Sequence, residues 1–171
     1  MEYREKLQAL ERRLREYGEI AVSFSGGVDS TFLLLFAKKV LGENVSAVTI
    51  SAPNFAPDEI RYAQELCKKE GIRHFVLELG EEIFSAFSHN PPGRKALEEL
   101  SIARPLKEAG LTKKEVRRGL KELGGDIWDK PAFACLASRI PYGETITKEK
   151  LTAIYRAESL LQDLGFRQVR V

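Results

Sequence analysis

The chain has 171 residues, of which 43% are hydrophobic and 30% carry a charge, with a formal net charge of +2. This composition is typical of one globular domain with a sizeable core, and the small net charge argues against nucleic acid as the main partner. No signal peptide is visible and no apolar run is long enough for a membrane span, so we expect a cytoplasmic protein with no membrane partner.

The first half of the chain predicts alternating helices and strands. Leucines at helical spacing predict a leading helix over Tyr3–Tyr17. Apolar runs then alternate with helical patterns closed by glycine. The expected order is strand Glu19–Phe24, helix Ser30–Leu41, strand Val45–Ile50, helix Asp58–Glu70 and strand His74–Leu79. This order predicts an α/β fold, a parallel sheet with helices on both faces, whose ligands bind at the carboxyl ends of the strands.

The second half predicts helices joined by irregular segments. Thr112 and Glu115 form a capping box for a helix over Lys113–Leu123, and Thr147 can cap a last helix over Lys148–Leu164. The last helix is expected to turn a set of apolar side chains inward: Leu151, Ile154, Ala157, Leu160, Leu161 and Leu164.

The most informative stretch is Ser25-Gly26-Gly27-Val28-Asp29-Ser30, which joins the first strand to the helix after it. Its glycines allow a tight turn close to a ligand, and Asp29 and Ser30 can cap a helix whose free N–H groups attract anions. The stretch lacks the Gly-Lys-Ser/Thr ending of a Walker A motif, which argues against a kinase or GTPase. The position between strand and helix favours a phosphate site over a Gly-Gly turn that binds nothing.

The same six residues resemble the PP-loop, Ser-Gly-Gly-x-Asp-Ser, of the ATP pyrophosphatases, which have an adenine nucleotide alpha hydrolase-like fold. The resemblance implies cleavage of ATP between its α- and β-phosphates, with AMP passed to a substrate oxygen and pyrophosphate released. It also implies that these residues hold the pyrophosphate part of ATP. The adenine is expected against the ends of the first two strands, near Val22, Phe24, Ile50 and Ser51.

A second unusual stretch, Trp128 to Gly143, mixes a thiol, a hydroxyl and a guanidinium in an irregular segment. Together with the PP-loop and residues 104–113, it resembles the LarE family of ATP-dependent sacrificial sulfur transferases over most of the chain. The resemblance implies that a carboxylate of a pyridinium biscarboxylate mononucleotide is adenylated and attacked by a cysteine thiolate. Cleavage of the cysteine C–S bond then leaves dehydroalanine and a thiocarboxylate, a precursor of a nickel-pincer cofactor.

On this resemblance Cys135 is the sulfur donor or a cluster ligand, and Ser138 and Arg139 hold the substrate. A guanidinium beside the thiol would favour the thiolate. The alternative for Cys135 is a small buried apolar side chain, which is the reading we prefer for Cys67 on its helical stripe. The implied cofactors are ATP and Mg²⁺, with an iron–sulfur cluster as a second source of sulfur, and the sequence names no metal ligand.

The chain departs from the family after Asn90-Pro91-Pro92-Gly93-Arg94, where relatives have several dozen further residues. We therefore expect a segment to be missing near residues 92–95. We expect residues 1–165 to form the adenylating domain and residues 166–171 to begin a C-terminal strand or domain. A PP-loop amide synthetase, a tRNA thiolase and a non-catalytic adenine-nucleotide-binding protein remain alternatives, and homo-oligomerisation is left open.

Overall fold

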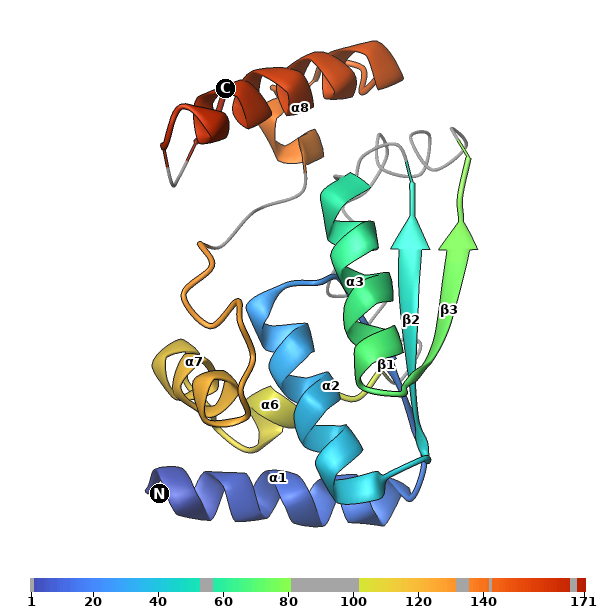
Figure 1. The fold of residues 1–171 in the computed structure, drawn as a ribbon, viewed down its shortest axis with the longest axis vertical. Helices are drawn as coiled ribbons and strands as arrows, with labels where there is room; N and C mark the ends of the chain where they lie inside the picture. Colours follow the sequence, from blue (N-terminus) through green and yellow to red (C-terminus); the bar gives the residue numbers. More distant parts are fainter. Residues whose placement is uncertain (1, 53–56, 81–101, 132–135, 142, 167–168) are drawn as a thin grey trace.

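A computed structural model describes all residues except 1, 53–56, 81–101, 132–135, 142 and 167–168 (Figure 1). Its elements follow the predicted order closely. They are α1 (Tyr3–Tyr17), β1 (Ile20–Ser23), α2 (Val28–Leu41), β2 (Val45–Ser51), α3 (Pro57–Lys69), β3 (Arg73–Glu78), α6 (Pro105–Glu108), α7 (Lys113–Glu122), the 3₁₀ helix η1 (Leu136–Arg139) and α8 (Lys148–Asp163).

The three strands form a parallel sheet in the order β1-β2-β3. Ile20 lies opposite Val45, and Ala47 lies opposite His74, so the carboxyl ends of the strands meet at one edge of the sheet. The parallel α/β fold predicted from the sequence is confirmed. Ligand-binding loops are expected at that edge, where β1 leads into α2 and β2 leads toward α3.

An apolar core holds the sheet and its neighbouring helices together. Helices α2 and α3 pack on the strands, and α1 and α7 pack on α2 (Figure 1). Phe24 and Phe32 are the largest fully buried side chains of this core. Cys67 lies in it, and burial raises the pKa of its thiol to about 11, which confirms the prediction of a packing role. Phe75 and Leu77 of β3 are half exposed.

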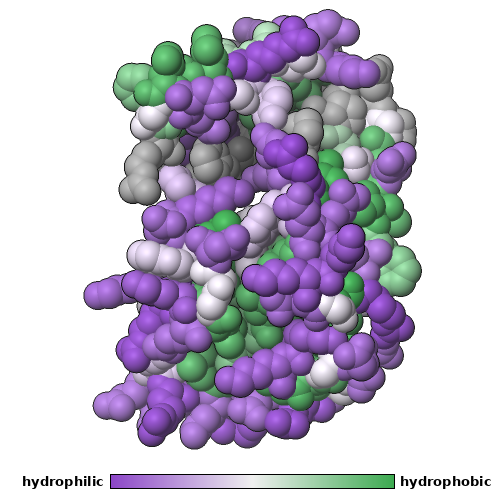
Figure 2. Space-filling view, in the orientation of Figure 1, coloured by the Kyte–Doolittle hydropathy of each residue, from purple (hydrophilic) through white to green (hydrophobic). Residues whose placement is uncertain are grey.

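Helix α8 lies at the opposite end of the molecule from α1 and packs against η1 (Figure 1). The prediction that a set of apolar side chains of this helix turns inward is wrong in part, because Leu160 and Leu164 are 62% and 68% exposed. Leu151 and Glu158, two turns apart, are the buried residues of α8 instead. Figure 2 shows hydrophobic residues gathered at this C-terminal end of α8, where Phe166 is also exposed.

The C-terminal strand expected over residues 166–171 stays a prediction. Residues 166 and 169–171 are irregular, and residues 167–168 lie outside the described part of the chain. Within the described ranges, none of the helices combines the length and the apolar run that a bilayer crossing requires.

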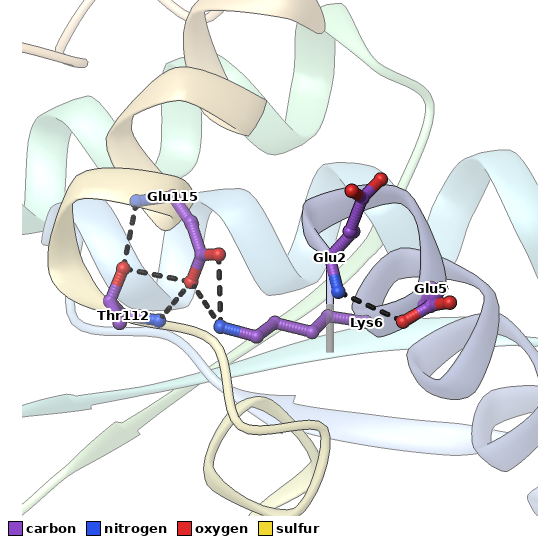
Figure 3. Close-up of polar contacts among 5 residues, drawn as sticks. All are labelled: Glu2, Glu5, Lys6, Thr112 and Glu115. Atoms are coloured by element: carbon purple, nitrogen blue, oxygen red, sulfur yellow. Dashed lines mark hydrogen bonds and ion pairs between the residues drawn. The ribbon is translucent and has the colours of Figure 1, made fainter.

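The predicted capping box of α7 is present and is tied to α1 (Figure 3). The Glu115 backbone N–H donates to Thr112 Oγ1 at 3.3 Å, and the Thr112 backbone N–H donates to Glu115 Oε2 at 2.7 Å. Lys6 Nζ reaches both carboxylate oxygens of Glu115 at 2.9 Å. These bonds lower the pKa of Glu115 to about 2, the backbone bond from Thr112 being the largest cause and Lys6 the next. Helix α7 is thereby fixed against α1.

Candidate functional site

The phosphate loop, residues 25–30, turns from β1 into α2 through a conformation that requires glycine. Gly26 has φ of +68°, and a Cβ added there would lie 3.1 Å from the backbone oxygen of Glu59. The first turn of α3 therefore closes on the loop, and only a residue without a side chain fits between them.

Helix α2 begins at Val28, two residues earlier than predicted, with Gly27 as its N-cap. The prediction that Asp29 or Ser30 caps the helix is thus wrong, since both lie in its first turn. No side chain caps this end of α2 in the described part of the chain. Uncapped backbone N–H groups at the positive end of a helix dipole are suited to bind an anion.

Two hydroxyls of the loop lie side by side. Ser25 Oγ is 3.2 Å from Ser30 Oγ, which donates to the backbone oxygen of Gly27 at 3.1 Å. A hydroxyl can exchange such a weak local bond for a phosphate oxygen without losing a buried partner. The phosphate contacts predicted for Ser25 and Ser30 stay predictions.

Asp29 brings a carboxylate to the loop and pairs with a cation from a distant helix. Its Oδ2 forms an ion pair with Lys113 Nζ at the N-terminal end of α7. Its Oδ1 is buried and has no hydrogen-bond partner among the described residues. A buried, unpartnered carboxylate oxygen fits the role of a single protein ligand to Mg²⁺, whose other ligands would be phosphates and water. No cluster of three metal-binding side chains occurs within the described ranges.

A cavity of about 60 Å³ opens at the carboxyl ends of β1 and β2, beside the phosphate loop. Its lining consists of Ser23, Phe24, Ser25, Thr49, Ile50, Glu59 and Ile60. Two of the four residues predicted to contact adenine, Phe24 and Ile50, line the cavity. Val22 is instead buried in the core, and Ser51 uses its carbonyl to accept the Leu79 backbone N–H. The predicted position of the adenine stays a prediction.

The floor of this cavity is held by a polar bridge between strands. Thr49 Oγ1 donates to the backbone oxygen of Phe24 at 2.7 Å and lies 2.8 Å from His74 Nε2. Burial lowers the pKa of His74, so the imidazole is neutral near pH 7. His74 therefore links β3 to Thr49 of β2 and has a structural role in the sheet.

Two basic residues of α7 face the site, which the sequence did not reveal. Lys113 and Arg117 are one helical turn apart and have the spacing of a solvated helix face. Lys113 nevertheless forms an ion pair with Asp29. Arg117 donates from Nη1 to the Trp128 carbonyl and from Nη2 to the Lys130 carbonyl, both at 2.7 Å. Helix α7 thus links the phosphate loop to residues 128–143, here called the cysteine segment.

The cysteine segment is described on both sides of its thiol. Cys135 itself lies in residues 132–135, outside the described part of the chain. Arg139, at the end of η1, forms a two-pronged ion pair with Glu158 of α8, at 2.7 Å from Nε and 3.1 Å from Nη2. Both side chains are almost completely buried, and Arg139 Nη1 also donates to Ser138 Oγ at 3.1 Å. The substrate contacts predicted for Ser138 and Arg139 stay predictions, and the structure adds a structural partner to each.

Comparison with known proteins identifies the family to which the chain is similar. The sequence model of the asparagine synthase family matches residues 2–107. An uncharacterised protein of Synechocystis is 34% identical, covering 97% of this chain and 77% of the relative. The pyridinium-3,5-bisthiocarboxylic acid mononucleotide synthase of Lactiplantibacillus plantarum is 30% identical, covering 97% of this chain and 75% of the relative.

These two alignments run over 206 and 207 residues, although the chain has 171. The relatives therefore contain residues with no counterpart here, and the position expected for the missing segment, near residues 92–95, stays a prediction. That junction lies in residues 81–101, outside the described part of the chain.

Solved structures support the fold. An ammonia-dependent NAD synthetase from Campylobacter jejuni, in complex with nitrate, superposes with a TM-score of 0.54 at 16% sequence identity. The superposition covers 96% of this chain and 89% of the synthetase. At this level of identity the likeness concerns the fold alone, a parallel sheet flanked by helices.

Proposed function

The chain belongs to the asparagine synthase family of PP-loop proteins and, within it, to the LarE-like ATP-dependent sulfur transferases, and we propose that it converts a substrate carboxylate to a thiocarboxylate. The observation that carries this proposal is the uncapped N-terminus of α2 beside the cavity, together with the cysteine segment that α7 ties to the same loop. The substrate proposed is a pyridinium biscarboxylate mononucleotide, by analogy with the named relative.

The first step proposed is adenylation. The substrate carboxylate attacks the α-phosphate of ATP, and the bond to the β-phosphate breaks to release pyrophosphate. The phosphate loop would hold the departing pyrophosphate through the N–H groups of α2 and the hydroxyls of Ser25 and Ser30. Lys113 would add a positive charge at the same loop. Mg²⁺, when bound, would neutralise charge on the leaving group. Among the described residues, the carboxylate of Asp29 would hold it.

The second step proposed is sulfur transfer from Cys135. The thiolate attacks the acyl carbon, AMP leaves, and a thioester joins the substrate to the protein. Removal of the α-proton of Cys135 then breaks its Cβ–S bond, which leaves dehydroalanine in the chain and the thiocarboxylate on the product. This step consumes one cysteine for each sulfur transferred.

The two cysteines of the given sequence do not by themselves supply the ligands of an iron–sulfur cluster. The sequence contains two cysteines, and Cys67 is buried in the core with a pKa raised by burial to about 11. One remaining thiol cannot supply the three or four ligands that such clusters take from cysteine. We therefore propose Cys135 itself as the source of sulfur.

Intact-protein mass spectrometry before and after turnover tests this proposal. We expect the protein to lose the mass of one hydrogen sulfide molecule in the presence of ATP and the carboxylate substrate, with the loss located at residue 135. Cys67→Ser is the matched control and should behave like the unmodified protein. Amide synthetase chemistry needs no cysteine, so repeated consumption of ATP and the carboxylate by Cys135→Ser, at the rate of the unmodified protein and without thiocarboxylate, would favour an amide synthetase instead.

A further inference from the structure

Glu59 is an acidic residue in the wall of the apolar cavity. Its side chain is 28% exposed, and burial raises the pKa of its carboxyl group, against the opposing effect of Lys130. A carboxylate held in such surroundings is costly unless a positive charge or a hydrogen-bond donor offsets the lost hydration. The cation that lies near it is Lys130, whose Nζ is 3.8 Å from Glu59 Oε1.

Lys130 is held from several sides. Its backbone carbonyl accepts from Arg117 at 2.7 Å, and its ammonium lies 5.9 Å from the centre of the Tyr62 ring. The Tyr62 hydroxyl in turn donates to Asp126 Oδ1 at 2.9 Å. Two residues in the first two turns of α3, Glu59 and Tyr62, therefore contact the chain at residues 130 and 126. These contacts lie on either side of residue 128, where the cysteine segment begins.

Glu59 is the point at which three parts of the site meet. Its backbone oxygen lies against Gly26 of the phosphate loop, and its side chain lines the cavity. The same side chain pairs with Lys130, five residues before Cys135 in the sequence. Residues 59 and 130 are far apart in the chain, so this contact depends on the fold rather than on a local motif.

We propose that Glu59 and Lys130 are positioning residues for the sulfur-transfer step, because their ion pair fixes the start of the cysteine segment beside the nucleotide cavity. This inference rests on the proposed function, in which the thiol must attack an acyl-adenylate held at that cavity. Correct placement of two reacting groups accounts for a large part of the rate of such a step, and small displacements are costly. The affinity for ATP would then depend on the phosphate loop, whereas the Glu59–Lys130 pair would affect the rate of sulfur transfer.

A double-mutant cycle tests the pair. Glu59→Gln, Lys130→Gln and the double variant are compared with the unmodified protein in single-turnover thiocarboxylate formation and in ATP binding. We expect each single variant to slow sulfur transfer at least tenfold and the double variant to be no slower than the worse single one, because one contact is lost in all three. We also expect Lys130→Gln to keep its Kd for ATP within about twofold. Glu65→Gln, at an exposed position on α3, is the matched control and should retain the full rate.

Two results would overturn the proposal. The losses in the two single variants could multiply in the double variant, which would mean that the residues act independently. Alternatively, Lys130→Gln could weaken ATP binding as much as it slows sulfur transfer, which would make Lys130 a nucleotide ligand.

A separate readout keeps this test distinct from that of the proposed function. Alkylation of Cys135 by iodoacetamide, followed by mass spectrometry, needs no turnover. If the unmodified protein releases no pyrophosphate, the proposed function fails. The rate at which iodoacetamide labels Cys135 then still tests whether Glu59 and Lys130 position the cysteine segment. A change of at least fivefold in both single variants supports it, and unchanged rates overturn it.

Discussion

The nucleotide half of the molecule and the part that carries the cysteine segment are held together by different forces. The first half packs α2 and α3 on the sheet through an apolar core around Phe24 and Phe32. In the second, η1 and α8 are joined by the buried pair of Arg139 and Glu158, while Leu160 remains exposed. Apolar packing is non-directional and tolerant, whereas a buried ion pair depends on both partners and on their geometry.

This contrast fits the work proposed for each half. The phosphate loop must keep one rigid shape for ATP, and a tightly packed core provides that shape. The cysteine segment must meet an adenylate formed elsewhere, and directional contacts fix where such a segment lies. The two halves should therefore respond differently to substitution, and four predictions address that difference.

The largest effect is expected in the part that carries the cysteine segment, when its buried ion pair loses one charge. Glu158→Gln removes the carboxylate that pairs with the buried Arg139 guanidinium, so we expect a loss of about 3–5 kcal/mol of unfolding free energy. Chemical denaturation followed by circular dichroism measures it. Arg139→Met combined with Glu158→Leu should recover much of this loss, since no lone charge remains. Equal stability of Glu158→Gln and the unmodified protein would remove the contrast between the two halves.

The next largest effect is expected in the phosphate loop of the nucleotide half. Gly26→Ala places a Cβ 3.1 Å from the Glu59 backbone oxygen, so the loop must shift and pyrophosphate release should fall roughly 100-fold. Gly42→Ala is the matched control, because Gly42 has a similar φ of +61° with nothing within 4 Å of the added Cβ. It should cost stability through backbone strain alone and leave the rate of pyrophosphate release unchanged. Equal activity losses in the two variants would show that strain, not the contact with α3, is responsible.

A smaller effect is expected where α7 bridges the two halves. Lys113→Met removes the cation paired with Asp29, so the Kd for ATP should rise about tenfold, or about 1.4 kcal/mol. Isothermal titration calorimetry measures it. Lys114→Met, at the exposed neighbouring position, should bind ATP as the unmodified protein does. Similar losses in both variants would reduce the role of Lys113 to general surface charge.

The smallest effect is expected at the junction of α1 and α7, drawn in Figure 3. The pKa of Glu115 is lowered in the folded protein from its ordinary value of 4.5 to about 2, first by the Thr112 backbone bond and then by Lys6. Its contribution to stability is therefore present above pH 4.5 and is lost as the pH falls toward 2. Melting temperatures recorded across this range should fall less steeply for Glu115→Gln. Parallel pH profiles for the two proteins would contradict this account.

The sequence predicted the parts of the structure that local rules control. The order of the strands and main helices, the capping box of Thr112 and the core position of Cys67 follow from periodicity and neighbouring residues, and the structure confirms them. The glycines of the phosphate loop likewise predicted a tight turn between β1 and α2, and Gly26 has φ of +68° there. The N-cap of α2 was misplaced because Asp29 and Ser30 are good capping residues, and nothing local shows that they point to a site instead.

The contacts between distant segments could not be predicted. Lys113 and Arg117 have the spacing of a solvated helix face, and only the packing of α7 on α2 brings them to the loop and to the cysteine segment. Glu158 is of a residue type typical of a solvated helix face, and its pairing with Arg139 of η1 accompanies its burial. In each case the deciding partner lies on another element, beyond the reach of periodicity.

A single-turnover assay that measures pyrophosphate and thiocarboxylate together tests the central claim most directly. With ATP, Mg²⁺ and a pyridinium biscarboxylate mononucleotide, the account predicts carboxylate-dependent pyrophosphate release and an equal amount of thiocarboxylate. Binding of ATP without release of pyrophosphate, or release without any thiocarboxylate, would contradict it.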